Sequence, residues 1–97
     1  MKKIKIIFEK EISNMEYNQL ESEIYKIIGI GKISNVTPSR KSSFPEPNGK
    51  IPNTINGIKV IGEISEEDYE KNEEKMKKVA SKISNEFKIE YSDFNTK

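Results

Sequence analysis

The sequence contains no cysteine and no histidine, and these two absences exclude several kinds of chemistry. Without cysteine there can be no disulfides, thiolate nucleophiles or zinc–thiolate centres, and the composition fits a reducing compartment. Without histidine the chain lacks the commonest general base and the commonest transition-metal ligand. We therefore expect no catalytic residue, no metal and no cofactor, and we expect that the protein is not an enzyme.

The chain also lacks an excess of charge of either sign and any long apolar run. Its 17 basic and 16 acidic residues give a net charge of +1, so the whole protein has no field strong enough to attract nucleic acid or a membrane surface. The apolar run after Lys3 ends at Glu9, which is too short for the core of a signal peptide. No segment approaches the roughly 20 apolar residues that cross a bilayer. These features predict a soluble cytoplasmic protein without a membrane partner.

What the sequence has in abundance is isoleucine, with 16 among 97 residues, although only 33% of the chain is apolar. The isoleucines are concentrated in a few periodic runs, which argues against disorder because burial in such runs offsets chain entropy. We expect a single domain over residues 1–94 and a frayed polar tail over residues 95–97.

The first half of the chain predicts a strand, a helix and a second strand. Residues 2–9 alternate apolar and basic side chains, which is typical of a strand with one buried face. A capping box at Ser13 and Glu16 begins a helix over about residues 14–28. Residues 31–37 then favour a strand with a bulge.

The second half repeats this rhythm. Residues 57–64 alternate as a strand, and Ser65 is an N-cap followed by acidic residues that suit the positive end of a helix dipole. Apolar residues at helical spacing extend as far as Phe87, so we expect the chain's longest helix there. Residues 88–91 form a short last strand.

The predicted order is β-α-β-β-α-β, in the α+β class. Such a chain closes as a ferredoxin-like sandwich, a four-stranded antiparallel sheet with two helices on one face. The first and third strands, which are the most apolar, should lie in the centre. Their open face would then carry these side chains: Lys3, Lys5, Ile7, Lys59, Ile61 and Glu63.

All four prolines lie between positions 38 and 52, within a Pro/Ser/Asn-rich segment at residues 38–56. It is either a mobile loop or a long hairpin with its tip at residues 45–49, whose arms continue the second and third strands. Its candidate partner-binding residues are Arg40, Lys41, Phe44, Lys50 and Ile51. An aromatic side chain beside proline can bind with little loss of entropy. Alternatively, the apolar residues of the segment fold back onto the open face of the sheet.

Other signals for chemistry have simpler interpretations. The acidic residues between 66 and 74 have lysine partners four positions away and read as a solvated helix face. The glycines at 29 and 31 follow a helix and precede a strand, the reverse of the order in phosphate-binding loops. Lys5, Lys59 and Lys88 could form a basic strip on the sheet, interrupted by Glu63 and Glu90, but no aromatic side chain is there to stack on RNA bases.

The leading hypothesis is a small non-enzymatic protein-binding module that contacts its partner through the 38–56 arm. It would act as an inhibitor, adaptor or accessory factor of the kind that phages and mobile elements encode. The second hypothesis is a ligand-gated or nucleic-acid-binding regulator, with nucleotide or nucleic acid held by Lys32 and the basic residues of the arm. Self-association into a homodimer, through the sheet face or a hairpin arm, is a third interpretation.

Overall fold

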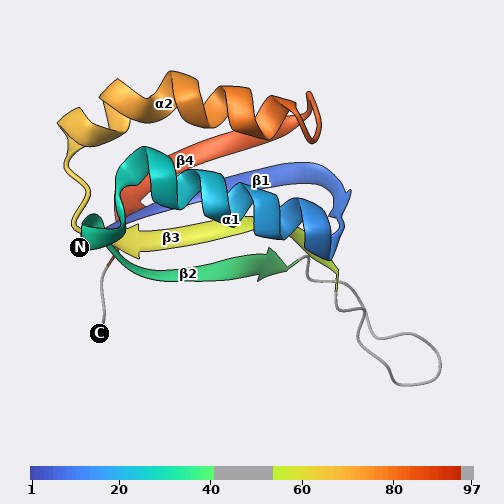
Figure 1. Ribbon diagram of the computed structural model, residues 1–97, viewed down its shortest axis with the longest axis horizontal. Coiled ribbons are helices and arrows are strands. Elements are labelled where there is room, and N and C mark those ends of the chain that lie inside the picture. The colour runs from blue at the N-terminus through green and yellow to red at the C-terminus, as the bar shows by residue number, and fades with distance from the viewer. Residues whose placement is uncertain (41–53, 95–97) are drawn as a thin grey trace.

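The chain folds into an open four-stranded sheet with two helices on one of its faces (Figure 1). The computed structural model describes residues 1–40 and 54–94. In chain order the elements are β1 (Lys2–Ile12), α1 (Asn14–Ile28), the 3-10 helix η1 (Ile30–Lys32), β2 (Ile33–Arg40), β3 (Ile55–Gly62), α2 (Glu66–Ser81) and β4 (Phe87–Asp93). The predicted β-α-β-β-α-β order is confirmed, with η1 added between α1 and β2.

The strands lie in the order β2-β3-β1-β4, and each neighbouring pair is antiparallel. The central strands are β1 and β3, as their apolar content predicts. In register, Ile4 lies opposite Val60 and Ile6 opposite Ile58. Because side chains alternate between the two faces of a strand, these four residues share the face that the helices cover.

The core fills the space between this covered face and the helices, where α1 packs mainly on β3 and β2 and α2 packs on α1 and β4. Its buried residues are Ile4, Ile6, Phe8, Ile12, Tyr17, Leu20, Ile24, Ile28, Ile58, Val60, Ile64, Met76, Val79 and Ala80. Fully burying one side chain of this size contributes roughly 1.5–3 kcal/mol. The isoleucine-rich layer is therefore the main source of stability.

Both helices begin where their capping residues predict. The Ser13 hydroxyl accepts a hydrogen bond from the Glu16 amide at 3.1 Å, and the Glu16 carboxylate accepts one from the Ser13 amide at 2.9 Å, which completes the capping box. Ser65 caps α2 in the same way through the Asp68 amide. Gly29 ends α1 with a φ of 103°, a backbone conformation that favours glycine.

Helix α2 is shorter than its apolar spacing suggests. We predicted that it continues to Phe87, and this was wrong, because α2 ends at Ser81 and Phe87 is the first residue of β4. Ile83 lies in the intervening turn, where its amide donates to the Ala80 carbonyl. Ile83 and Phe87 both pack against the core from non-helical backbone. Apolar spacing alone does not distinguish such residues from a continuing helix.

Pro38 lies within β2, opposite Ile58, at the edge of the sheet. The amide of Glu9 donates to the Glu86 carbonyl and that of Phe94 to the Met1 carbonyl. In an antiparallel sheet, successive residues of a strand turn their backbone N–H and C=O groups alternately toward the neighbouring strand on one side and on the other. When this alternation is followed from β4 through β1 and β3 to β2, the Pro38 nitrogen points away from β3. The missing amide hydrogen therefore costs no hydrogen bond to β3, as the prediction of an edge position requires.

The two ends of the predicted 38–56 arm are strands. Residues 38–40 belong to β2 and residues 55–56 to β3, so these parts of the segment are paired and not loop. The choice between a loop and a hairpin tip concerns residues 41–53, which lie outside the described residues. That choice stays a prediction.

Close approach of β1 and β3 explains one glycine of the sheet. A Cβ at Gly57 would lie 2.0 Å from the main-chain oxygen of Ile6, far inside any normal contact. Glycine therefore lets the two central strands pair at this point. Neither α1 nor α2, the two α-helices of the described residues, is long and apolar enough to cross a membrane.

Candidate functional site

The face of the sheet opposite the helices is covered by no described element (Figure 1). Its composition follows from the register. Three rows of side chains run across β2, β3, β1 and β4: Asn35, Ile61, Lys3 and Ser92; Thr37, Lys59, Lys5 and Glu90; Ser39, Gly57, Ile7 and Lys88. We call this surface the lysine face, after Lys3, Lys5, Lys59 and Lys88.

The four lysines of this face are not neutralised by ion pairs. Within residues 1–40 and 54–94, the ion pairs involve Lys2, Lys26, Lys32 and Lys77, and none involves a lysine of the lysine face. The side chains of Lys5 and Lys59 lie directly opposite each other in register. Like charges in this position destabilise a sheet. A feature that opposes stability on an exposed surface favours a role in binding.

Two isoleucines lie among these lysines. Ile61 is only 7% exposed and Ile7 is half-buried, although both point away from the helices. In register, Ile61 lies between Asn35 and Lys3. Lysine can lay its methylene stem along an apolar neighbour while its ammonium group stays in water. The face therefore has the Lys5–Lys59 pair in its middle row, with one isoleucine in the row on each side.

The predicted composition of the open face is confirmed for the residues within β1 and β3. Lys3, Lys5, Ile7, Lys59 and Ile61 share it as expected. Glu63 directly follows β3, is exposed, and donates its amide to the Lys32 carbonyl. The acidic residue within the three rows is Glu90, opposite Lys5. Glu90 therefore interrupts the basic strip, as predicted.

The structure places one of the predicted partner-binding residues. Arg40 is the exposed last residue of β2, and it is in register with Ile55 at the sheet edge. Lys41, Phe44, Lys50 and Ile51 lie outside the described residues. Lys32, predicted as a further basic contact, is instead paired with Asp68 at 3.0 Å. The described residues therefore do not gather the predicted set into one surface.

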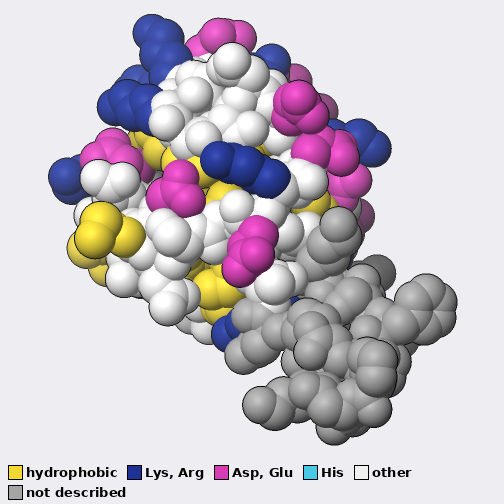
Figure 2. Space-filling view, turned by 90° about the vertical axis from the view of Figure 1, so that its right-hand side faces the viewer, with side chains coloured by type: hydrophobic (Ala, Val, Ile, Leu, Met, Phe, Trp, Pro, Cys, Tyr) yellow, Lys and Arg dark blue, Asp and Glu magenta, His cyan; other side chains and the backbone are white. Residues whose placement is uncertain are grey.

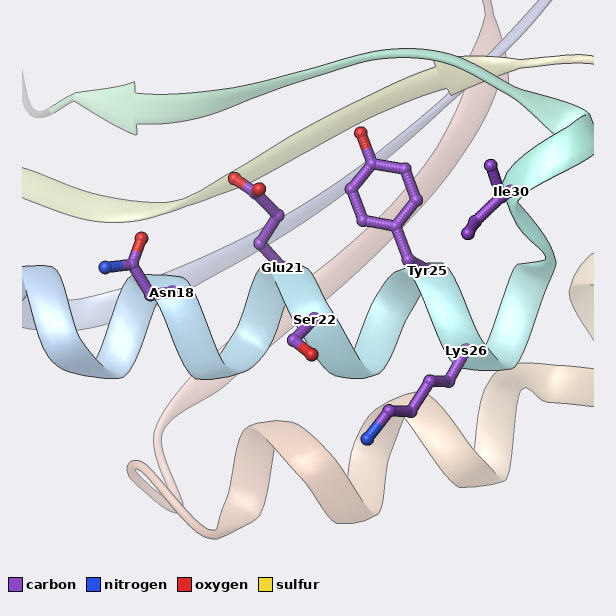
Figure 3. A pocket seen from close by; sticks show the side chains of 6 residues that line it. All are labelled: Asn18, Glu21, Ser22, Tyr25, Lys26 and Ile30. Atoms are coloured by element: carbon purple, nitrogen blue, oxygen red, sulfur yellow. The ribbon is translucent and has the colours of Figure 1, made fainter.

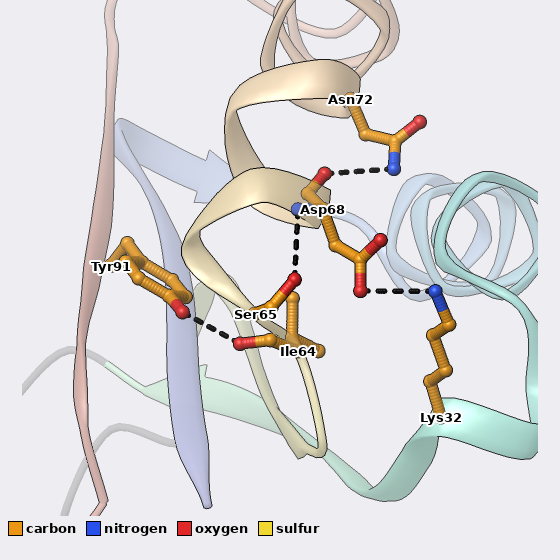
Figure 4. Close-up of polar contacts among 6 residues, drawn as sticks. All are labelled: Lys32, Ile64, Ser65, Asp68, Asn72 and Tyr91. Carbon is orange, nitrogen blue, oxygen red and sulfur yellow. Dashed lines mark hydrogen bonds and ion pairs between the residues drawn. The ribbon is translucent and has the colours of Figure 1, made fainter.

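A polar cluster joins the start of α2 to the sheet (Figure 4). Asp68 binds Lys32 of η1, and the Asn72 side-chain amide donates to the Asp68 carbonyl at 2.9 Å. The Tyr91 hydroxyl of β4 donates to the Ile64 carbonyl at 2.6 Å. Each partner is used within the cluster, which is what a structural anchor requires. Among the acidic residues that begin α2, Asp68 is thus held in a structural contact.

The titration of these groups agrees with a structural role. Hydrogen bonds from Lys32 and then Ser65 hold the pKa of Asp68 below its ordinary value. Burial and then a hydrogen bond to Glu73 raise the pKa of Tyr69 to about 12, and burial raises the pKa of Tyr91. The two tyrosine rings stack with centroids 4.6 Å apart. A tyrosine acting as a general base at neutral pH needs the opposite shift.

A second surface feature is a groove of about 640 Å³ along α1 (Figure 3). Its described lining is Asn18, Glu21, Ser22, Tyr25, Lys26 and Ile30. Glu21 and Tyr25 point to one side of α1 and Lys26 to the other, while Ile30 of η1 is 75% exposed. All the lining comes from α1 and η1, so the groove has no second wall among the described residues. Small-molecule sites usually bury most of their ligand, and this groove does not favour one.

The end of the molecule that Figure 2 shows carries charges of both signs. Basic and acidic side chains are interspersed there with small apolar areas. Within residues 1–40 and 54–94, no group of three or more acidic side chains is arranged to hold a metal ion. The segment from Gly29 to Lys32 forms a helix end and η1, as predicted, and not a phosphate loop.

No known family model matches the chain, and no curated protein matches its sequence. Any functional assignment must therefore come from the geometry described above.

Proposed function

We propose that this chain is a small non-enzymatic protein-binding module that presents its lysine face to an acidic surface of a partner protein. The observation that carries the proposal is the set of four lysines that share the uncovered side of the sheet with Ile7 and Ile61 and form no ion pair with the described residues. Charge complementarity speeds association and selects the partner, while the two isoleucines contribute burial. The module would serve as an inhibitor, adaptor or accessory factor, as small proteins of phages and mobile elements do.

The same proposal includes a finer description of the fold. The strand order β2-β3-β1-β4 with both helices on one side supports its assignment as a ferredoxin-like sandwich. In this arrangement the helices close one face of the sheet and leave the other for recognition. Fold alone does not specify the partner, which is why the assignment rests on the side chains of the lysine face.

The 38–56 arm, with Arg40 at its described beginning, remains a second candidate contact in the same role. β2 ends at Arg40 and β3 begins at Ile55, and these two residues are paired, so the arm leaves and re-enters the sheet at one end. A partner seated on the lysine face could reach that end. Replacing residues 40–51 by a short Gly/Ser turn tests this contact separately.

Nucleic acid is the competing partner, because lysines also bind phosphate. The lysine face has no aromatic side chain for base stacking, and the net charge of +1 gives little long-range attraction. These two observations favour a protein partner. A single-stranded oligonucleotide and a polyglutamate peptide of equal charge are the appropriate probes.

The test is an NMR titration of the labelled protein with each probe. We expect polyglutamate to shift the amide signals of β1 and β3 on the lysine face and the oligonucleotide to bind no more tightly. Lys59→Glu should weaken polyglutamate binding by about tenfold, since it reverses one of four charges at the centre of the face. Lys10→Glu makes the same change in net charge from the exposed end of β1 and should leave binding within about twofold.

Three results decide against the proposal. Tighter binding of the oligonucleotide, with a steep dependence on salt, would assign the face to nucleic acid. Equal losses in Lys59→Glu and Lys10→Glu would show a general charge effect without a site. Capture of a cellular partner that survives Lys59→Glu but is lost with the 40–51 replacement would assign recognition to the arm.

A further inference from the structure

The two edges of the sheet differ in their capacity to accept another strand. β2 turns the backbone of Val36 and Pro38 outward, and Pro38 has no amide hydrogen to donate. β4 contains no proline. Proline on an edge strand protects it from pairing, and so do charged side chains. β2 is therefore closed by Pro38, whereas β4 keeps all its amides and carries charges of both signs at Lys88, Glu90 and Asp93.

The hydrogen bonds between β1 and β4 define which groups of β4 are unused. Glu9 is bonded to Glu86 and Phe94 to Met1, at the two ends of the ladder. The register between these ends is regular. Alternation therefore turns the even-numbered residues of β4 toward β1 and the odd-numbered residues outward. The outward amides and carbonyls belong to Phe87, Ile89, Tyr91 and Asp93, and no other strand of the described residues pairs with them.

The side chains of β4 are complementary to those of a second, antiparallel copy. On the lysine face, Lys88 and Glu90 are two positions apart with opposite charges, and both are exposed. On the covered face, Phe87, Ile89 and Tyr91 are only partly buried at the rim of the core. If β4 pairs with β4 of a second copy, the apolar side chains at the rim of the core are covered and the charges of Lys88 and Glu90 are neutralised.

We propose that the chain forms a two-fold symmetric dimer in which β4 pairs with β4 of a second copy, centred on Ile89. In this register Lys88 of each copy lies opposite Glu90 of the other, and Phe87 lies opposite Tyr91. The Ile89 pair and the Phe87–Tyr91 pairs are the hydrogen-bonded ones, which is the phase that the outward groups require. The Lys88–Glu90 pairs fall at the closer, non-hydrogen-bonded positions, where side chains interact best.

Neighbouring registers are disfavoured by charge. The outward amides and carbonyls belong to odd-numbered residues. A shifted register can therefore form hydrogen bonds only if odd-numbered residues of one copy still lie opposite odd-numbered residues of the other. Centring it on Glu90 puts the two Glu90 carboxylates opposite each other, and centring it on Lys88 does the same for the two ammonium groups. Like charges directly opposite destabilise a strand pair, so the register centred on Ile89 is favoured over these two neighbours.

The dimer has a consequence for the lysine face. A two-fold axis perpendicular to the sheet keeps both helix layers on one side and both uncovered faces on the other. The two lysine faces then join across the junction into one surface on an eight-stranded sheet, twice the four strands of one chain. The dimer rests on the β4 edge and shares Lys88 with the lysine face, while Lys3, Lys5 and Lys59 lie on the two central strands, away from the junction.

The test is a charge-exchange experiment on the full chain, with mass in solution measured by light scattering over the micromolar range. The native protein should be dimeric. Lys88→Glu and Glu90→Lys each place like charges opposite at both ends of the junction, and each should weaken the dimer by about tenfold or more. The double variant restores opposite charges in every pair and should dimerise as the native chain does. An equimolar mixture of the two single variants, one carrying an affinity tag, should form heterodimers.

Lys59→Glu is the matched control, because it reverses a charge on the same face away from the edge and should leave the dimer intact. Circular dichroism checks that each variant is folded. A native chain that stays monomeric throughout the range overturns the proposal. Single variants that dimerise as tightly as the native chain also overturn it, as does failure of both the double variant and the mixture to restore association.

Discussion

The two faces of the sheet are built from the same strands, yet one is apolar and buried and the other carries lysines. On the covered face, apolar side chains alternate into a core in which Ile4, Ile6 and Ile58 are fully buried. On the lysine face, the positions between them carry Lys5 opposite Lys59, an arrangement that costs stability. The covered face is explained by burial alone. The lysine face is not, and this contrast is what supports the proposed contact with a partner.

The sharpest way to test this contrast is to compare two neighbouring residues of β1. Ile6 is fully buried on the covered face, and Ile7 is half-buried on the lysine face. Ile6→Ala should reduce the free energy of unfolding by about 2–5 kcal/mol, because it leaves a cavity in the core. Ile7→Ala should cost less than about 1.5 kcal/mol, because its site opens to water. Urea denaturation measures both.

Equal losses in the two alanine variants would show that the uncovered side is part of a core. A loss at Ile7 that grows with protein concentration would instead indicate that association buries this face.

A smaller effect of opposite sign is expected at Lys59. Lys59→Glu replaces the like-charge pair with Lys5 by an attractive pair and should raise the free energy of unfolding by about 0.2–1 kcal/mol. The same variant should weaken binding of the acidic probe, as described above. Thermal unfolding at low salt measures the gain, and high salt should reduce it. A loss of stability in Lys59→Glu would contradict the view that this face is arranged for binding.

The smallest expected effect concerns pH and the anchor of α2. The pKa of Asp68 is lower in the folded protein than its ordinary value of 3.8, chiefly through Lys32. Its ionised form therefore stabilises the fold above that ordinary value, and the contribution is lost as the pH falls through the folded-state pKa. Asp68→Asn should reduce stability slightly at neutral pH and should differ less from the native chain in acid. Urea denaturation at pH 7 and pH 3 compares them, and Glu70→Gln, an exposed change on the same helix, is the control.

Much of the fold could be predicted because local patterns and packing agree. The capping box at Ser13 and the N-cap at Ser65 mark helix starts through contacts within one turn. The end of α2 could not be predicted, because Phe87 has the spacing of a helix and the packing of a strand. Its place was decided by contact with Phe8 across the sheet, with ring centroids 6.1 Å apart.

The candidate site was only partly predictable for a related reason. Alternation indicated which residues of β1 and β3 share the open face, since it depends on strand geometry alone. It did not indicate that Glu63 lies beyond β3, nor that Lys32 pairs with Asp68. Both follow from how η1 and α2 meet the sheet. The predicted role of four further residues in partner binding stays a prediction, since they lie outside the described residues: Lys41, Phe44, Lys50 and Ile51.

By itself, the sequence determined the number and order of the elements and which side of each strand is apolar, because these depend on periodicity and on contacts between near neighbours. Only the tertiary structure decided which strands form the edges, which lysines converge, and in what phase the backbone of β4 faces outward. Those properties depend on register between strands distant in the chain, and a shift of one residue would exchange the two faces.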